Sequence, residues 1–288
     1  MSASMPKKTA IPKKTSLKRK MAKPIVLSIA GSDSSAGAGL QADLKTFSTL
    51  GCHGLTAVTC VVAETPLEVR SIHPIPLDIF RDQLEILFES YPINAIKTGL
   101  LCTPEQVAIV CKLLQDRDIP LVVDPVMVAS TGDTLQTSDS LGALKKLLTL
   151  ATVITPNFPE AEILLNRKIQ TSNDQESAAH ALAKQFATAC YLKGGHSTSN
   201  QEICDLLVER DGVKRALKAP FQKIPQTHGT GCTLAAAFAV GLAEKRTIFE
   251  AAHQAHQFTQ RAIRDSHSWK APGTDLAIMH LDQVQGQS

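Results

Sequence analysis

One stretch, Thr227-His228-Gly229-Thr230-Gly231-Cys232-Thr233, runs directly into Leu234-Ala235-Ala236-Ala237-Phe238-Ala239-Val240. Two glycines flank a threonine, and the small and apolar residues that follow predict a buried helix. A glycine loop that opens a helix directs free N–H groups and the positive end of the helix dipole at one point, where an anion, most often phosphate, can bind. The stretch therefore predicts a phosphate site, with a plain glycine turn before a buried helix as the alternative.

Cys232 falls in the first turn of this predicted helix. The field that favours an anion there also favours a thiolate over a thiol, so we expect a reactive cysteine. The alternative is a small buried side chain that only packs.

Outward from this helix, short apolar segments alternate with amphipathic ones along the whole chain. The predicted strands are Ile25–Ala30, Gly54–Val62, Ala95–Thr98, Leu121–Asp124, Val153–Thr155, Cys190–Lys193 and, in a hairpin, Ile203–Val208. The predicted helices are Leu40–Leu50, one starting at Asp78, one after a Thr103 cap, one from Pro159, Ser172–Phe186 with a cap formed by Ser172 and Gln175, and Ile248–Ile263. Crossovers of this length require parallel strand pairing. The fold class is therefore α/β, a central and mainly parallel sheet with helices on both faces.

Polar and glycine-rich clusters follow the predicted strands. They are Gly31–Gly39, Lys97–Gly99, Asp124, Asn157, Lys193–Gly195 and Gly229–Cys232. Ligands bind such sheets at the carboxyl ends of the strands, so we expect these clusters to converge on one site.

The net charge of +3 arises from the N-terminal segment. Residues 1–23 hold eight basic side chains and no acidic one, which leaves 22 basic against 27 acidic side chains in residues 24–288. We expect a disordered basic tail over 1–23 and one folded domain over 24–288, because the tail has too few apolar residues to order itself. A solvated extension is favoured over a nucleic-acid or membrane tether. Seven scattered cysteines without a C-x-x-C pair, and the absence of a secretion signal, predict a cytoplasmic protein with free thiols.

Several motifs in order resemble the hydroxymethylpyrimidine/phosphomethylpyrimidine kinases of thiamine synthesis, which have the ribokinase-like fold. The resemblance covers about Pro24 to Ile263 and rests on Ala30–Asp33 with Gly37–Phe47, Asp124–Met127, Ser130–Asp133, Thr155–Asn157 with Glu160, Lys193–His196 and Gly229–Cys232. It implies ATP and Mg²⁺ as cofactors. Gly229, Thr230 and Gly231 would form, with Cys232, the anion hole for the transferred phosphoryl group.

The same resemblance assigns the nucleotide side of the site. Lys193 would neutralise nucleotide phosphate charge, with Asn157 and Asp124 also at the nucleotide, and Asp124 and Glu160 offer oxygen atoms to Mg²⁺ or its waters. The alternatives are a solvated lysine for Lys193, a strand-end cap for Asp124 and a first-turn helix carboxylate for Glu160. Cys232 would act as general base on the alcohol. The second phosphorylation needs no base, because its acceptor oxygen is already anionic.

For the pyrimidine, the resemblance implies Gly31, Asp33, Asp43 and Glu64 near the substrate, with Val62 lining the pocket. The family usually has glutamine where Glu64 stands, and often methionine where Leu100 stands. Glutamine can accept from the 4-amino group and donate to the ring nitrogen, whereas ionised glutamate only accepts. A protonated Glu64, a protonated ring or a substrate with a second donor would restore the match. A Glu64 that turns to solvent and reads nothing is the remaining alternative.

The sequence thus predicts an ATP-dependent kinase acting on hydroxymethylpyrimidine and on its monophosphate. A pyridoxal kinase of the same cysteine-bearing branch is one alternative, and a non-catalytic vitamer-binding homologue is another. The expected partners are the small-molecule pyrimidine, ATP and a second copy of the chain in a homodimer, with no membrane and no nucleic acid.

Overall fold

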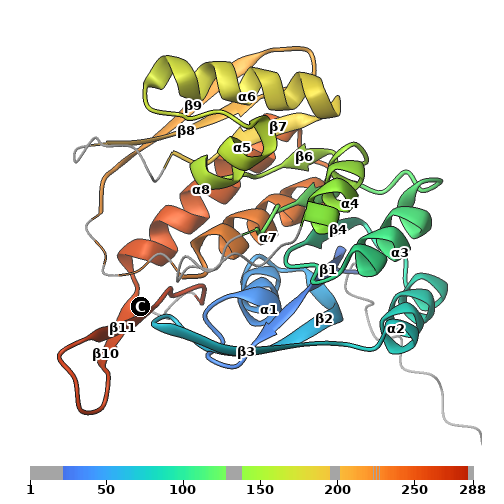
Figure 1. The fold of residues 1–288 in the computed structure, drawn as a ribbon, viewed down its shortest axis with the longest axis horizontal. Helices are drawn as coiled ribbons and strands as arrows, with labels where there is room; N and C mark the ends of the chain where they lie inside the picture. Colours follow the sequence, from blue (N-terminus) through green and yellow to red (C-terminus); the bar gives the residue numbers. More distant parts are fainter. Residues whose placement is uncertain are drawn as a thin grey trace, which may run out of the picture.

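A nine-stranded mixed sheet forms the centre of the computed structural model, which describes residues 22–127, 138–194, 202–222, 224, 226 and 228–284 (Figure 1). The strand order is β3-β2-β1-β4-β5-β6-β7-β8-β9, and a separate hairpin pairs β10 with β11. The strands are β1 (Ile25–Asp33), β2 (His53–Thr65), β3 (Glu68–Pro74), β4 (Ala95–Thr98), β5 (Leu121–Val123), β6 (Val153–Ile154), β7 (Ala189–Leu192), β8 (Glu202–Val208), β9 (Lys214–Pro220), β10 (His267–Lys270) and β11 (Ala277–His280).

The interior of the sheet is parallel and its two edges are antiparallel. β2, β1, β4, β5, β6 and β7 pair in parallel. β3 runs antiparallel to β2, and β8 and β9 add an antiparallel hairpin beyond β7. The mainly parallel α/β sheet and the hairpin at Ile203–Val208 are therefore confirmed.

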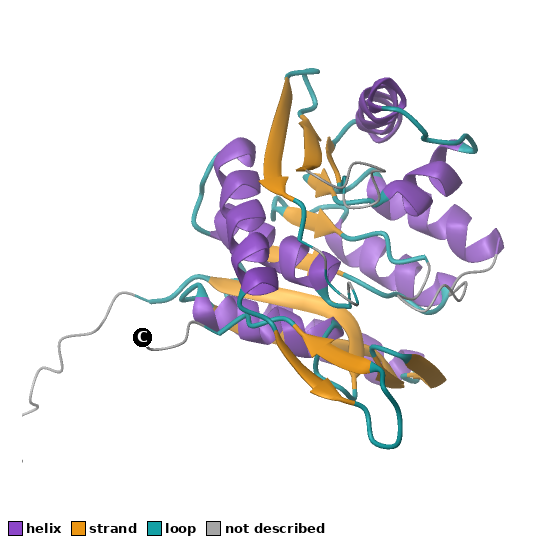
Figure 2. Ribbon diagram, turned by 90° about the vertical axis from the view of Figure 1, so that its left-hand side faces the viewer, coloured by secondary structure: helices purple, strands orange, loops and turns teal. Residues whose placement is uncertain are grey.

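Helices cover both faces of this sheet (Figure 2). They are α1 (Gly39–Thr49), α2 (Leu77–Ser90), α3 (Pro104–Leu114), α4 (Ser138–Leu148), α5 (Phe158–Leu165), α6 (Ser172–Phe186), α7 (Thr230–Ala243) and α8 (Ile248–Arg264). One core cluster joins α2, α3, α4, α5 and α6 to the sheet, and a second joins α1, α7 and α8 to its other face. Alternate residues of the strands enter the two clusters, Val26 one and Leu27 the other, because successive side chains point to opposite faces.

The alanine-rich helix α7 lies at the centre of its layer. Every residue from Thr233 to Ala243 is buried, and the helix contacts β1, β4 and β5 as well as α1 and α8. A helix that is apolar all round requires such a position, and its small side chains permit close packing. The packing brings the first turn of α7 to the carboxyl ends of the parallel strands.

The predicted elements agree with these within a few residues, with one wrong cap and several omissions. Thr103 caps α3 as expected, with Pro104 at the first position. The cap of α6 is Thr171 with Asp174, one residue before the predicted Ser172 and Gln175. The helix α4 and the strands β3, β9, β10 and β11 were not predicted. The sequences of β3, β9 and β10 lack the apolar run of a buried strand, and most of their residues are exposed.

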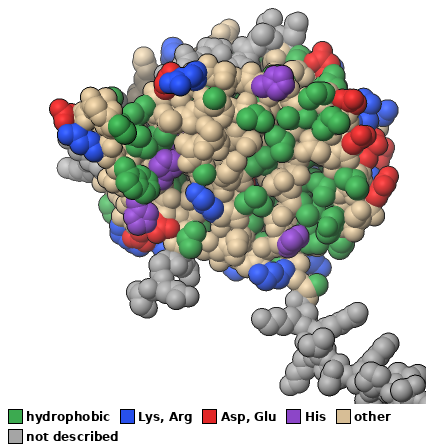
Figure 3. Space-filling model, turned by 90° about the horizontal axis from the view of Figure 1, so that it is seen from below, with side chains coloured by type: hydrophobic (Ala, Val, Ile, Leu, Met, Phe, Trp, Pro, Cys, Tyr) green, Lys and Arg blue, Asp and Glu red, His purple; other side chains and the backbone are tan. Residues whose placement is uncertain are grey.

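Seen from below, relative to Figure 1, the surface carries hydrophobic side chains in its middle and acidic side chains towards its rim (Figure 3).

None of the helices in the described part of the chain is long and apolar enough to span a bilayer. The N-terminal tail up to residue 21, the Ser130–Asp133 motif and Gly195–His196 lie outside the described residues.

Candidate active site

The first turn of α7 begins at Gly229, as the sequence predicts. Gly229 has a φ of 80°, in the left-handed region, and a Cβ placed on it would lie 1.9 Å from the carbonyl oxygen of Gly37. Only glycine satisfies both the dihedral angle and this approach. Because glycine has no side chain to cap the helix and the first turn holds no acidic residue, the positive end of the dipole favours an anion here.

Lys193, Asp124 and Glu160 meet beside this turn. Lys193 Nζ lies 2.8 Å from Asp124 Oδ1 and 3.8 Å from Glu160 Oε2. A Cβ placed on Gly231 would lie 3.1 Å from Lys193 Nζ and 3.4 Å from Asp124 Oδ2. Residues from the ends of β5 and β7 and from the start of α5 therefore converge on α7.

The charge of Lys193 is held by these carboxylates. Burial acts to lower the pKa of Lys193, but the charges of Asp124 and Glu160 outweigh it and raise the pKa above its ordinary value. With only 16% of its side chain exposed, Lys193 is not the solvated lysine of the alternative interpretation. It is a fixed positive charge facing the helix N-terminus.

Glu160 has two roles. Its Oε2 accepts a hydrogen bond from the Asn157 backbone N–H at 2.8 Å, and Asn157 Oδ1 accepts from the Glu160 N–H at 2.9 Å, so the two form a capping box for α5. Burial raises the pKa of Glu160 to about 7, with Lys193 opposing and Asp124 adding to the shift. The expected first-turn carboxylate is present, and it also lies within reach of Lys193.

Asp124 and Glu160 fit a magnesium ion by their chemistry. Asp124 Oδ1 is shared by Lys193 and the Thr155 hydroxyl, which lies 2.9 Å away, whereas Oδ2 faces Gly231. Carboxylate oxygens at the edge of a phosphate site are the ligands Mg²⁺ prefers, directly or through water. The pair is thus able to hold the ion beside the anion site.

The expectation of a Cys232 thiolate is wrong, because the pKa of this thiol is raised and not lowered. Burial raises the pKa of Cys232 to about 11, and the charges of Asp43 and Asp124 add to this effect. Lys97 and a hydrogen bond from the Gly39 backbone N–H act in the opposite direction without overcoming it. Cys232 is half-buried, and this partial loss of water disfavours the charged thiolate.

Asp43, whose charge acts on Cys232, forms a buried ion pair with Lys97. Its carboxylate accepts from Lys97 Nζ at 2.8 and 3.0 Å and from the Ser28 hydroxyl, and neither Asp43 nor Lys97 is exposed. Burial acts to lower the pKa of Lys97, but Asp43 outweighs it and raises the pKa. Sequence analysis did not single out Lys97 as a site residue, although a lysine inside the otherwise apolar strand Ala95–Thr98 is a signal of such a pair.

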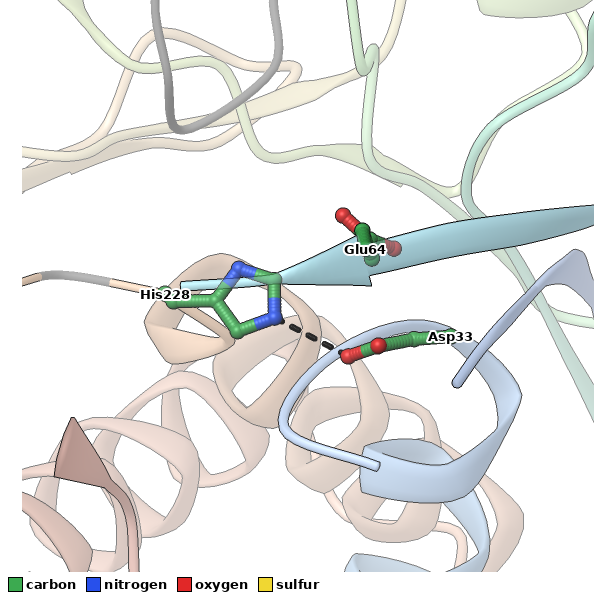
Figure 4. A group of neighbouring side chains, drawn as sticks. All are labelled: Asp33, Glu64 and His228. Carbon is green, nitrogen blue, oxygen red and sulfur yellow. Dashed lines mark hydrogen bonds and ion pairs between the residues drawn. The ribbon is translucent and has the colours of Figure 1, made fainter. Parts of the chain in front are cut away.

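Asp33 organises the glycine-rich loop between β1 and α1. Its carboxylate accepts from the backbone N–H groups of Ser35, Gly37 and Ala38. It also contacts His228 Nε2 at 2.9 Å (Figure 4). Burial opposes ionisation, but the hydrogen bonds from His228, Ala38 and Ser35 outweigh it and lower the pKa of Asp33.

This bond joins residues 195 positions apart in the sequence. It ties the loop after β1 to the residue before Gly229. His228 was not predicted as a site residue, and its place next to the glycine motif is the available signal.

Glu64 lies next to Asp33 and His228 at the end of β2 (Figure 4). Ligand atoms of the three side chains lie within 4.8 Å of one another. The oxygens of Asp33 are already used by the loop, so the group suits a hydrogen-bonded polar corner better than a cation site. Burial and then the charge of Asp33 raise the pKa of Glu64 to about 7, with His228 opposing.

The remaining predicted substrate residues lie along the same strand ends. Asp33 pairs with Val62 in the parallel register of β1 and β2, and Val62 is buried. A Cβ on Gly31 would lie 3.6 Å from Val62 Cγ2. The Ser34 hydroxyl bonds both the N–H and the carbonyl of Glu64, which joins the loop to β2. Asp43, in its ion pair with Lys97, is fully buried, and Asp33 and Val62 are almost completely buried.

The family model and the curated relatives are phosphomethylpyrimidine kinases, and the similar solved structures include both these and pyridoxal kinases. The model of the phosphomethylpyrimidine kinase family matches residues 33–274. A hydroxymethylpyrimidine/phosphomethylpyrimidine kinase of Haemophilus influenzae is 44% identical over 242 residues, which are 83% of this chain and 90% of that protein. Among solved structures, an ADP complex of Bacillus subtilis pyridoxal kinase superposes with a TM-score of 0.82 at 32% identity, covering 91% of this chain and 98% of that one.

A phosphomethylpyrimidine kinase from Clostridium difficile superposes with a TM-score of 0.73 at 33% identity, covering 84% of this chain and 100% of that one. The match therefore extends over most of the chain, and the strand-end residues described above lie within it. This chain belongs to the phosphomethylpyrimidine kinase family.

Proposed function

We propose that the protein transfers the γ-phosphoryl group of ATP to the hydroxymethyl group of 4-amino-5-hydroxymethyl-2-methylpyrimidine and then to its monophosphate. The observation that carries the proposal is the convergence of Lys193 and Asp124 on Gly231, within the first turn of α7. Phosphoryl transfer requires positioning and charge neutralisation above all, and this arrangement supplies both.

The phosphoryl group would bind between the α7 N-terminus and Lys193. Backbone N–H groups from Thr230 to Cys232 would donate to its oxygens, and Lys193 would balance the charge that develops. Asp124 and Glu160 would hold Mg²⁺, which neutralises nucleotide phosphate charge when bound. Asn157 would border the nucleotide from the start of α5.

Cys232 would accept the proton of the substrate alcohol. Because its pKa is raised to about 11, only a small fraction is thiolate at neutral pH, and the base is available through that fraction. The positive charge of Lys97, which acts to lower this pKa, would stabilise the thiolate. The monophosphate would bypass this step, since its acceptor oxygen carries its own negative charge.

Glu64 would recognise the aminopyrimidine edge in its protonated form. A carboxylic acid presents one acceptor oxygen and one O–H donor, as the glutamine amide does, and a pKa of about 7 makes this form abundant at neutral pH. Asp33 and Gly31 would shape the loop around the ring, with Val62 beneath it. Asp43 would act through Lys97 and not touch the substrate.

Product analysis by mass spectrometry tests the proposal. The protein is incubated with ATP, Mg²⁺ and hydroxymethylpyrimidine, its monophosphate or pyridoxal in separate reactions. Formation of the pyrimidine monophosphate and diphosphate supports the proposal. Phosphorylation of pyridoxal alone would favour the second candidate, a pyridoxal kinase, which the likeness to the Bacillus subtilis enzyme motivates.

We also propose that residues 24–288 form the kinase domain and that residues 1–23 are a tail outside it. We further propose a homodimer in which the outer strand pair, β2 and β3, forms the interface. On the outer face of β2 and β3, the four exposed side chains of Val61, Ala63, Ser71 and His73 include no acidic or permanently basic one, and Glu68 lies at the end of this face opposite Thr65. The side chain of Val61 is 50% exposed.

The free cysteines among the described residues suit a reducing compartment. Deletion of residues 1–21 should leave kcat unchanged.

A further inference from the structure

A buried polar network lies beside β7, outside the site described above. Asp205 of β8 accepts a hydrogen bond from the Tyr191 hydroxyl at 2.7 Å and lies 3.0 Å from His256 Nδ1 of α8. Tyr191 is fully buried, and Asp205 and His256 are less than 10% exposed. Burial and the neighbouring carboxylate raise the pKa of Tyr191, so its hydroxyl remains a donor.

The other oxygen of Asp205 reaches the backbone next to Lys193. Asp205 Oδ1 accepts from the Gly194 N–H at 2.6 Å. A Cβ on Gly194 would lie 1.9 Å from the Cys204 carbonyl oxygen, so the backbone is pressed against β8 at this point. On the opposite side, the Lys193 N–H donates to the Pro156 carbonyl at 2.9 Å. The backbone of Lys193 is thus held from both neighbouring strands.

We propose that Asp205, oriented by Tyr191 and His256, is a positioning residue that fixes the end of β7 so that Lys193 points at the α7 N-terminus. The inference rests on the proposed phosphate-binding role of Lys193. A lysine side chain is long and flexible, and its charge is useful in phosphoryl transfer only where it is held in place. Asp124 and Glu160 hold its ammonium group, and Asp205 holds its backbone.

Removing Asp205 therefore impairs catalysis through Lys193. Loss of a residue that orients a functional group commonly lowers activity about 10- to 100-fold, and we expect a fall of kcat in this range for Asp205→Ala. The loss should be equal for the pyrimidine and its monophosphate, because Lys193 acts on the phosphate donor. Pyrimidine binding in the absence of nucleotide, measured by calorimetry, should be unchanged. Asp205→Asn retains an oxygen for the Gly194 N–H and should restore most of kcat.

A double-variant comparison separates positioning from general damage. In the Lys193→Ala background, Asp205→Ala should cause no further loss of kcat, because the group it positions is absent. Thr188→Val is the matched control, since the Thr188 hydroxyl makes a buried hydrogen bond to the Ala151 carbonyl at the other end of β7. It should lower the melting temperature with kcat intact.

Two results would overturn the inference. Losses that multiply in the double variant, or an equal fall of kcat in Thr188→Val, would show that Asp205 only stabilises the fold. An unchanged kcat in Lys193→Ala would also remove the proposed role of Lys193, which distinguishes that failure from the first. Should Asp205→Ala not fold, Tyr191→Phe keeps the ring against Phe238, and its smaller loss should likewise vanish in the Lys193→Ala background.

Discussion

At the scale of single residues, burial raises the pKa values of the two side chains to which we assign pyrimidine recognition and proton transfer. It raises the pKa of Glu64 to about 7 and that of Cys232 to about 11. Sequence reasoning identified both residues by their motifs. It predicted the wrong protonation state for Cys232, because a motif shows the helix N-terminus but not the partial burial of the sulfur or the carboxylates of Asp43 and Asp124 near it.

The pH dependence of pyrimidine binding tests the role of Glu64. Only protonated Glu64 donates to the ring nitrogen. The affinity for the pyrimidine should therefore fall as the pH rises above about 7, the pKa of Glu64 before the pyrimidine binds. Glu64→Gln carries the donor at every pH and should bind with a flatter profile. Calorimetric titrations from pH 6 to pH 9 measure this difference.

The wild type and Glu64→Gln are purified in the same way and titrated in the same buffers. Ser34 bonds only the backbone of Glu64, so the substitution leaves the loop in place. Coincident profiles with the same substrate preference would show that Glu64 does not read the pyrimidine edge.

Cys232→Ala should affect the two phosphorylations unequally. Loss of a general base lowers the rate of the alcohol step by roughly 10²–10⁴, whereas the monophosphate step needs no base. In the wild type, kcat for the alcohol should also rise with pH towards about 11, as the thiolate fraction grows. Separate initial rates with each substrate measure both effects. Equal losses in the two steps would restrict Cys232 to shaping the anion site.

At the scale of helices and strands, the site is assembled from strand ends, and the sequence predicted this well. The glycine-rich loop, Asp124, Lys193 and Gly229–Cys232 come together because carboxyl ends of parallel strands share one edge. The side-chain pairs that join different elements were not predicted. Lys97 with Asp43, and His228 with Asp33, join elements whose register depends on the whole fold.

Lys97→Met should destabilise the protein strongly. It leaves the fully buried Asp43 carboxylate without its ion-pair partner, and breaking a buried pair in this way costs about 3–5 kcal/mol. Asp43→Asn in the same chain removes the orphaned charge and should recover much of the loss. Urea unfolding gives the three free energies. A Lys97→Met protein as stable as the wild type would mean that water reaches Asp43.

The first turn of α7 should not tolerate a side chain at Gly229. Gly229→Ala meets both a positive φ and the Gly37 carbonyl, so stability and kcat should both fall. Gly212→Ala is the control, because Gly212 has a φ of 88° and a Cβ there would meet no described heavy atom within 4 Å. It should lose only the roughly 1–2 kcal/mol of the left-handed conformation. Similar losses of stability in the two proteins, with kcat intact in both, would contradict the close approach.

At the scale of the whole molecule, the layered α/β architecture was predictable and its edges were not. Apolar runs separated by amphipathic helices are sufficient to predict a parallel sheet. β3 and β9 alternate polar and half-buried residues in the manner of many loops, and only pairing with a neighbouring strand makes them strands. Of these two edges, the one formed by β3 carries the proposed dimer face.

Val61→Lys should convert a dimer to a monomer. The substitution places a charge on the exposed, uncharged face of β2, where two copies would meet and have to bury it. Light scattering with size-exclusion chromatography measures the mass of both proteins. Arg70→Glu on the neighbouring strand changes an exposed charge for another and should leave the mass unchanged. A wild-type monomer at all concentrations would refute the dimer.

The position of α7 in the chain has a consequence for synthesis on the ribosome. This helix supplies both the centre of one core layer and the proposed phosphate site, and it ends at Ala243 of 288 residues. The bond between Asp33, at the start of the loop after β1, and His228 likewise forms only after His228 has been synthesised. A nascent chain that has made all six parallel strands, β1, β2, β4, β5, β6 and β7, therefore still lacks the first turn of α7, and the proposed phosphoryl transfer should begin only when the chain is almost complete.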